Sequence, residues 1–182
     1  YYNPSEEQQI SRLESLLQPE AFANITQRLA DSGMRKGFAC LFYGAPGTGK
    51  TETVLQLARK TGRTLMQVNI SSIKDKYVGE SEKNIKNLFD RYRQLVESEP
   101  IAPILFFNEA DAIFNKRSEN TVRAVDKMEN AIQNIILQEM ETLEGILIAT
   151  TNLTSNLDSA FERRFIYKVK FAAPSLEAKQ AI

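Results

Sequence analysis

The first group of residues with a chemical function is a stretch of eight between an apolar run and a helix-like segment, and its pattern is typical of phosphate binding. The run GAPGTGKT, residues 44–51, follows FACLFY and precedes ETVLQLARK. Glycines let the backbone turn its N–H groups around a phosphate, and the helix that follows adds the positive end of its dipole. Lys50 would add a charge to the β- and γ-phosphates, and the Thr51 hydroxyl is a hard oxygen ligand for Mg²⁺. The pattern predicts a loop for ATP or ADP, formed by Gly44, Ala45, Pro46, Gly47, Thr48, Gly49, Lys50, Thr51 and Glu52.

A second polar group ends the apolar run ILFF, residues 104–107, and comprises Asn108, Glu109 and Asp111. A buried strand ending in two carboxylates lets an ATPase place an Asp on the water shell of Mg²⁺ and a Glu against the attacking water. Here Glu109 takes the second role and Asn108 the first. An amide oxygen can accept a hydrogen bond from such a water, but it lacks the charge that attracts the cation. We therefore expect Thr51 and Asn108 to hold a weakened metal site.

The elements that position these residues follow from the spacing of apolar side chains. Short apolar runs alternate with longer amphipathic segments, which predicts strands buried on both faces and an α/β, doubly wound parallel five-stranded sheet. Before the sheet, Ser5 and Gln8 predict the capping box of a first helix, and a second helix would run from Pro19 to a glycine cap at Gly33. The expected strands are FACLFY, TLMQV, PILFF, GILIAT and IYKVKF.

Composition excludes several classes of function. The 182 residues hold one cysteine, Cys40, and no histidine, which removes disulfide frameworks, Cys/His zinc sites and histidine-dependent nucleophiles. Lys plus Arg and Asp plus Glu each number 23, so no net basic field supports nucleic-acid binding. No apolar stretch reaches the roughly 18 residues of a membrane span, and the first residues given, YYNPSEEQQ, lack the basic and apolar regions of a signal peptide. We expect a cytoplasmic protein without a membrane partner.

Five motifs together resemble the AAA+ ATPases, in the same order and spacing. They are GAPGTGKT, KYVGESEKNIKNLF, LFFNEADAI, ILIATTN and LDSAFERRF, and the resemblance covers about residues 37–174. The pair Asn108–Glu109 resembles a group of bacterial AAA ATPases that carries Asn at this point. The resemblance implies a phosphate-loop ATPase core of αβα layers at 37–173 and the start of a helical lid at 174–182. The two helices expected before the core make residues 1–36 an N-terminal helical segment.

Further roles come from the resemblance alone. Asn152 matches the sensor position that orients the water near the γ-phosphate, which an amide can do because it both donates and accepts. Arg164, with Arg163 beside it, matches the arginine finger that a neighbouring subunit inserts against the γ-phosphate. The run at Lys76, Tyr77 and Val78 resembles a loop that lines a central pore and grips an extended polypeptide.

A trans-acting finger and a pore both require a head-to-tail ring, expected to be hexameric. The favoured function is an ATPase that hydrolyses ATP with Mg²⁺ and remodels or translocates a macromolecule, protein rather than nucleic acid. Two alternatives stay open. One is an ATP-binding assembly switch or scaffold with little hydrolysis, which Asn108 favours, and the other is a DNA-associated loader or motor, which the neutral charge disfavours. A small-molecule phosphate-loop kinase is disfavoured because it needs neither finger nor pore.

Overall fold

The computed structural model describes residues 2–34, 37–70, 80–115, 124–155 and 157–173, and its centre is one parallel sheet. The strands are β1 Phe38–Gly44, β2 Leu65–Asn69, β3 Ile104–Asn108, β4 Ile146–Thr151 and β5 Tyr167–Phe171. Their spatial order is β2-β3-β4-β1-β5, with every neighbouring pair parallel. The predicted fold class and all five predicted strands are confirmed. The order places the carboxyl ends of β3, β4 and β1 side by side.

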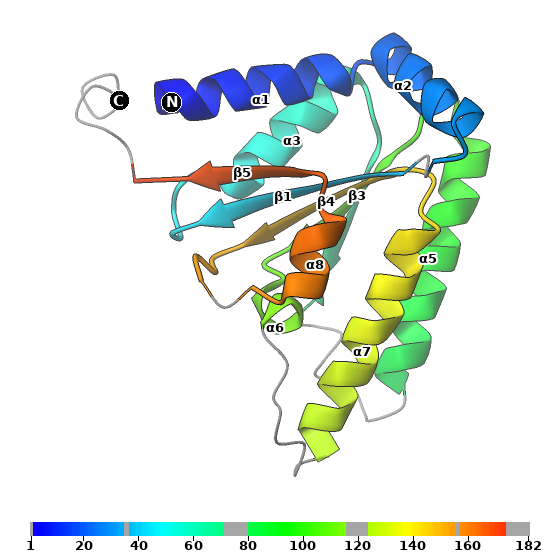
Figure 1. Ribbon diagram of the computed structural model, residues 1–182, viewed down its shortest axis with the longest axis vertical. Helices are drawn as coiled ribbons and strands as arrows, with labels where there is room; N and C mark the ends of the chain where they lie inside the picture. The colour runs from blue at the N-terminus through cyan, green and yellow to red at the C-terminus, as the bar shows by residue number, and fades with distance from the viewer. Residues whose placement is uncertain (1, 35–36, 71–79, 116–123, 156, 174–182) are drawn as a thin grey trace.

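Helices cover both faces of the sheet (Figure 1). In chain order they are α1 Pro4–Leu16, α2 Pro19–Asp31, α3 Lys50–Thr61, α5 Glu80–Ser98, α6 Asp111–Phe114, α7 Ala124–Glu141 and α8 Ser159–Arg164. Figure 1 shows α1 and α3 on one side of the sheet, and α5, α7 and α8 on the other. The molecule is therefore a three-layered α/β/α arrangement, as the apolar runs predicted.

Alternate residues of each strand divide between two apolar clusters, because successive side chains of a strand point to opposite faces. Cys40 and Phe42 of β1 pack with α1, α2 and α3, whereas Leu41 packs with α5, α6, α7 and α8. Cys40 is fully buried among apolar side chains, and burial raises the pKa of its thiol. Helix α5 presents an apolar stripe to the other cluster, in which Ile85 and Phe89 are fully buried.

The first helix differs from the prediction in its first turn, whereas the second begins at Pro19 as predicted. The first helix begins at Pro4, with Asn3 as its N-cap, so the predicted box of Ser5 and Gln8 is wrong. The Glu6 carboxylate accepts the backbone N–H of Asn3 at 3.4 Å and also that of Ala172, beyond β5, at 2.7 Å. A contact between distant segments thus selects the cap. The second helix ends as predicted, because Gly33 adopts a left-handed φ of 69°.

A buried arginine joins these helices to the core. Arg63 donates from Nε to the carbonyl of Leu17 at 2.9 Å and from Nη1 to the carbonyl of Ala102 at 2.7 Å. Its guanidinium lies 4.8 Å from the centre of the Phe22 ring. Burial lowers the pKa of Arg63. Within the residues that the structure describes, no helix combines the length and apolar character that crossing a membrane requires.

Candidate functional site

The glycine-rich loop lies between the end of β1 and the start of α3, as predicted. Gly47 and Gly49 have φ values of 73° and 90°, in the left-handed region that favours glycine. Gly44 also has a positive φ, of 141°, and a Cβ there would in addition lie 2.0 Å from the carbonyl oxygen of Phe171 in β5. The loop therefore turns tightly against the sheet and leads into the N-terminus of a twelve-residue helix. This is the geometry of a phosphate-binding turn.

Lys50 is held within this loop. Only 7% of the residue is exposed, and its Nζ donates to the carbonyls of Gly44 and Ala45 at 2.8 and 2.7 Å. A third contact runs to the Thr48 hydroxyl at 3.3 Å. Burial lowers the pKa of Lys50, and the nearby carboxylates of Asp111 and Glu109 oppose that shift. The side chain thus places a cation inside the loop, at the point where phosphate oxygens would bind.

Asn108 contacts the phosphate loop directly, although it ends β3 and lies 57 residues away in sequence. Its Oδ1 accepts a hydrogen bond from the Thr51 hydroxyl at 3.1 Å and another from the Thr150 hydroxyl at 3.0 Å. The structure therefore brings together the two residues that the sequence assigned to a metal. Both offer neutral, hard oxygen atoms, the type of ligand that Mg²⁺ takes in proteins.

Glu109 is exposed at the end of the same strand, with an unusual backbone. Its φ of 52° is the sole positive value among the non-glycine residues in the described parts of the chain. Such a conformation is costly for a residue with a side chain, and it is common at functional sites. The backbone N–H of Glu109 donates to the Thr150 hydroxyl at 3.0 Å. A strained turn therefore directs this carboxylate out of the sheet edge.

Asp111 connects the site to the end of β4. Its Oδ1 accepts the Thr151 hydroxyl at 2.6 Å and the backbone N–H of Asn152 at 2.8 Å. The sequence interpretation gave no role to Asp111 or Thr150. The signal for Thr150 was weak, since a threonine inside the strand ILIATT is explained equally well by strand propensity. Their connections appear only when β3 and β4 are neighbours.

Lys50, Glu109 and Thr150 line one pocket of about 350 Å³, within the size range of small-molecule sites, and Asn108 and Asp111 are bonded to residues of its wall. It is lined by Pro46, Gly47, Thr48, Gly49, Lys50, Thr51, Glu52, Glu109, Thr150 and Asn152. The pocket thus joins the predicted loop to the predicted water-activating Glu109 and the predicted sensor Asn152. A second pocket, of about 460 Å³, lies beside Tyr43, Glu162 and Lys168 and shares no residue with the loop. We assign the chemistry to the smaller pocket because the glycine loop, Lys50 and Glu109 meet there.

Residues 40–173 match the family described as the ATPase family associated with various cellular activities (AAA). The chain belongs to this family. Membership confirms the resemblance seen in the sequence, the fold class and the expected class of enzyme, an ATPase. It also implies nucleotide binding, and the pocket around Lys50 is the candidate site for it in this AAA chain.

Individual AAA relatives show moderate similarity. The chain is 31% identical over 144 residues to fidgetin-like protein 1 of Drosophila melanogaster, covering 78% of this chain and 27% of that protein. It is 30% identical over 152 residues to cell division protein C of Sulfolobus acidocaldarius, covering 78% and 38%. It is 32% identical over 176 residues to 26S proteasome regulatory subunit 7 of Dictyostelium discoideum, covering 92% and 37%. The chain spans well under half the length of each relative.

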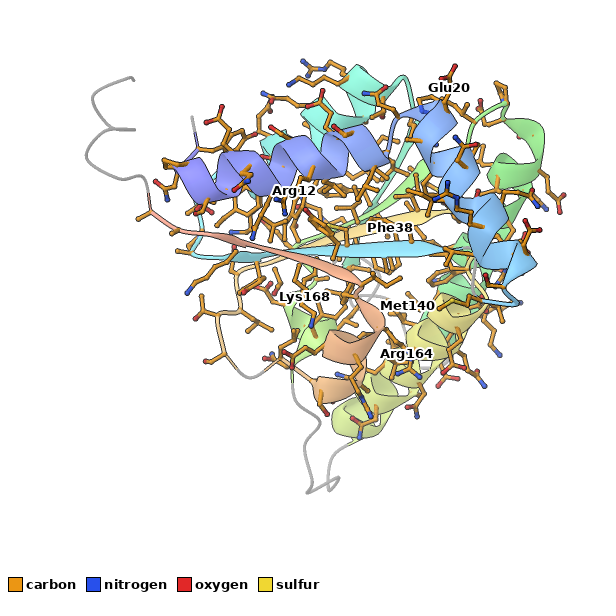
Figure 2. All side chains as sticks on the ribbon, turned by 45° about the horizontal axis from the view of Figure 1, so that its top comes forward. Arg12, Glu20, Phe38, Met140, Arg164 and Lys168 are labelled. Carbon is orange, nitrogen blue, oxygen red and sulfur yellow. The ribbon has the colours of Figure 1, made fainter. Side chains whose placement is uncertain are left out.

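The two candidate finger residues of this AAA chain lie on α8, away from the pocket. Arg164 has 23% of its side chain exposed, pairs through Nη2 with Glu141 of α7, and donates from Nη1 to the carbonyl of Ala160 at 3.1 Å. Figure 2 labels Arg164 beside α7, on the face of the sheet opposite Arg12 and α1. Arg163 is exposed. Neither residue reaches the nucleotide pocket of its own chain.

Lys76, Tyr77 and Val78, the expected pore loop, lie outside the described residues, as does the segment 174–182 that was expected to begin a lid. Of the loop residues, Ala45 and Glu52 are exposed, and the carbonyl of Ala45 is bound by Lys50.

Proposed function

We propose that this module binds ATP together with Mg²⁺ and hydrolyses it, and that it does so in a ring whose subunits complete each other's sites. One observation carries the proposal. Asn108 touches Thr51 of the phosphate loop, and Glu109 is directed into the pocket that Lys50 and Asn152 also line. A phosphate site, a metal site and a carboxylate that can act on water therefore meet at one edge of the sheet.

Nucleotide binding rests on the loop and Lys50. The loop backbone would donate its N–H groups to phosphate oxygens at the positive end of α3. Lys50 now donates to two loop carbonyls, and in a nucleotide complex its ammonium would turn toward the β- and γ-phosphates. Since it is already inside the loop, this change requires only a local movement.

The donor set fits Mg²⁺. The Thr51 hydroxyl and the Asn108 oxygen are 3.1 Å apart, so both can face a cation at the phosphates. When bound, Mg²⁺ would act as a Lewis acid that withdraws charge from the phosphate oxygens. The residues present supply no formal negative charge at Asn108, so we expect weaker retention of the cation than an aspartate would give.

Glu109 would act on the water. Its carboxylate is exposed in the pocket and can accept a proton from a water that attacks the γ-phosphate. Asn152 would orient that water, because its backbone is tied to Asp111 and its amide can donate and accept. Lys50 and Arg164, the latter from a neighbouring subunit, would neutralise the charge that develops.

The proposed ring rests on the position of the two candidate finger residues. Neither Arg164 nor Arg163 lines the pocket of its own chain, which supports a role in trans. An exposed carboxylate, Glu141, holds Arg164, and such a pair is readily exchanged for another partner. We propose a hexamer that grips a protein substrate through Tyr77.

The family match from residue 40 supports the proposed domain boundary near residue 37.

The test is ATP binding by calorimetry of purified Lys50→Ala. Loss of the buried ammonium should abolish measurable binding while circular dichroism and the unfolding midpoint stay near those of the parent protein. The matched control is Lys60→Ala, on the same helix but exposed and paired with Glu14 at 3.5 Å, which should bind ATP normally. Undiminished affinity in Lys50→Ala would refute the assignment of the pocket.

Asn108 keeps one competing function open, an ATP-dependent assembly switch with little hydrolysis. Glu109→Gln separates the two. If the protein hydrolyses ATP, this variant should bind Mg²⁺ and ATP but lose turnover, because the group that polarises the water is gone. A parent protein that binds ATP, assembles and shows no turnover would favour the switch.

A further inference from the structure

Thr150, the fifth residue of β4, is bonded to three successive residues of the neighbouring strand end. Its hydroxyl accepts the N–H of Glu109 at 3.0 Å and donates to Oδ1 of Asn108 at 3.0 Å. Its carbonyl accepts the N–H of Ala110 at 2.9 Å. Only 2% of the residue is exposed. One buried threonine thus connects the proposed metal-side amide to the proposed water-activating residue.

The first consequence concerns the backbone of Glu109. Its left-handed φ of 52° is unfavourable for a residue with a Cβ, so neighbouring contacts must maintain it. The backbone N–H groups on either side of this turn, those of Glu109 and Ala110, both donate to Thr150, the first to its hydroxyl and the second to its carbonyl. Removing the hydroxyl would leave the Glu109 N–H without this acceptor. The direction of the Glu109 side chain therefore depends on Thr150.

The second consequence concerns Asn108. An amide can present either its oxygen or its NH₂ group, whereas a carboxylate presents oxygen on both sides. Hydroxyl protons from Thr51 and Thr150 both point to Oδ1, which turns the oxygen toward the phosphate loop. Because the Glu109 N–H already occupies a lone pair of the Thr150 oxygen, the hydroxyl proton is available for Asn108. An aspartate at position 108 would need this orientation much less.

We propose that Thr150 is a positioning residue: a single hydroxyl directs the Asn108 oxygen toward the metal side of the pocket and holds Glu109 in its strained turn. This inference rests on the proposed function, because it assigns Thr150 a part in metal binding and hydrolysis at that site. Thr150 acts through its two neighbours. Its predicted effect is on Mg²⁺ and on turnover, with ATP binding in the absence of metal left intact.

The test compares Thr150→Val, which removes the hydroxyl and keeps the branched shape, with Thr150→Ser, which keeps the hydroxyl. The first readout is the ATP affinity measured by calorimetry with and without Mg²⁺. Without Mg²⁺, Thr150→Val should bind ATP with the affinity of the parent protein. The factor by which Mg²⁺ increases the ATP affinity should be about 10- to 100-fold smaller in this variant, as is typical when a metal ligand loses its supporting partner. Thr150→Ser should retain that gain.

The matched control is Thr61→Val. Thr61 is also buried, but its hydroxyl donates to the carbonyl of Leu57 in its own helix at 2.6 Å, away from the pocket. This variant should keep the Mg²⁺ dependence of the parent protein. If Thr150→Val does not fold, Thr150→Ala serves as the second variant that lacks the hydroxyl. In kinetics, loss of the hydroxyl should raise the Mg²⁺ concentration for half-maximal rate and should lower kcat even at saturating Mg²⁺ and ATP, and serine should restore both values.

A double variant separates positioning from packing. In an Asn108→Asp background, Thr150→Val should reduce the Mg²⁺-dependent gain in ATP affinity by a smaller factor, because either carboxylate oxygen can face the cation. The inference is overturned if Thr150→Val keeps the Mg²⁺ dependence of the parent, or if the loss is equal in both backgrounds. If the parent binds ATP with Mg²⁺ but shows no turnover, hydrolysis is refuted and the binding data alone decide the role of Thr150. If the parent does not bind ATP, both proposals fail.

Discussion

At Asn108 the protein uses a neutral oxygen where a phosphate-loop ATPase would normally have a carboxylate. The structure surrounds that oxygen with two hydroxyl donors, from Thr51 and Thr150. These bonds fix its direction but cannot replace its missing charge. A site built this way should recognise the geometry of a bound cation and hold it weakly.

Asn108→Asp should therefore strengthen Mg²⁺ binding. A hydrogen bond to a charged acceptor is stronger than one to a neutral acceptor by about 1 kcal/mol, which corresponds to roughly fivefold in affinity. The Mg²⁺ concentration for half-maximal ATPase rate should fall by about this factor, as measured by titrating Mg²⁺ at saturating ATP. Asn87→Asp, an exposed change on α5, is the charge-matched control and should have no effect.

The opposite pattern has a defined meaning. If the parent protein lacks Mg²⁺-dependent hydrolysis and Asn108→Asp acquires it, then Asn108 inactivates the site. The assembly-switch function would then replace hydrolysis as the better account of this module.

At the scale of elements, the long helix α5 packs on the sheet through its apolar side chains and is also hydrogen-bonded to it by the Tyr92 hydroxyl. The Tyr92 Oη lies 2.7 Å from the carbonyl of Pro103 and accepts the N–H of Ile146 at 2.8 Å. These two partners lie at the starts of β3 and β4. Tyr92 therefore sets the position of α5 at the end of the sheet opposite the nucleotide pocket, and its role is stability.

Tyr92→Phe should lower the free energy of unfolding by about 1–3 kcal/mol, because buried backbone groups lose their partner. ATP affinity should be unchanged. Tyr167→Phe is the matched control, since that phenol donates to the carbonyl of Gln9 at 3.1 Å in an exposed position. Urea unfolding followed by circular dichroism measures both. If both variants lose the same free energy of unfolding, the buried Tyr92 hydrogen bonds contribute no more to stability than the exposed bond of Tyr167.

The same burial makes a prediction about pH. Desolvation raises the pKa of Tyr92 above its ordinary value of 10.0. A group with a raised folded-state pKa supplies its full stability below its unfolded pKa and loses it as pH rises above that value. Above pH 10 the parent protein should therefore lose stability faster than Tyr92→Phe, with a difference in slope approaching about 1.4 kcal/mol per pH unit.

At the scale of the whole molecule, the position of Arg164 bears on the proposal that one chain alone does not complete the ATPase site. It is half-buried against α7 and paired with Glu141, whose side chain is 55% exposed. Exposed ion pairs contribute about 0–1 kcal/mol to stability, so the γ-phosphate of a nucleotide bound to a neighbouring subunit could compete with Glu141 for this guanidinium. Within a single chain, the phosphate loop and Glu109 line one pocket, whereas Arg164 lies outside it, at the end of α8.

Mixing subunits tests the role of Arg164 in trans. Subunits with Arg164→Ala retain Glu109, and subunits with Glu109→Gln retain Arg164, so some mixed interfaces would be complete. Because fingers contribute about 10³ to 10⁵ in rate, even a few complete sites should raise ATPase activity above that of either variant. A mixture of Lys50→Ala with Glu109→Gln should show no rescue, since both residues belong to the same pocket. Absence of rescue in the first mixture would confine Arg164 to its own subunit.

The sequence alone determined features that depend on nearby residues. Strand positions followed from apolar runs because burial on both faces selects apolar residues at successive positions. The phosphate loop followed from Gly47, Gly49 and Lys50, because the turn and its charge lie within eight residues. The pairing of Asn108 and Glu109 at a strand end was also predicted, since both follow ILFF directly.

Only the tertiary structure decided features that join distant segments. The order β2-β3-β4-β1-β5 places Thr150 against Asn108 and Glu109, more than 40 residues away in sequence, and no local pattern encodes that contact. The first cap was mispredicted for the same reason, because Glu6 is selected partly by its bond to Ala172, 166 residues away. Likewise, Glu141 and Arg164 meet only because α7 and α8 pack together. Hydrogen bonds between segments brought together by burial of the apolar core are properties of the fold, and they determine how the local motifs are aligned.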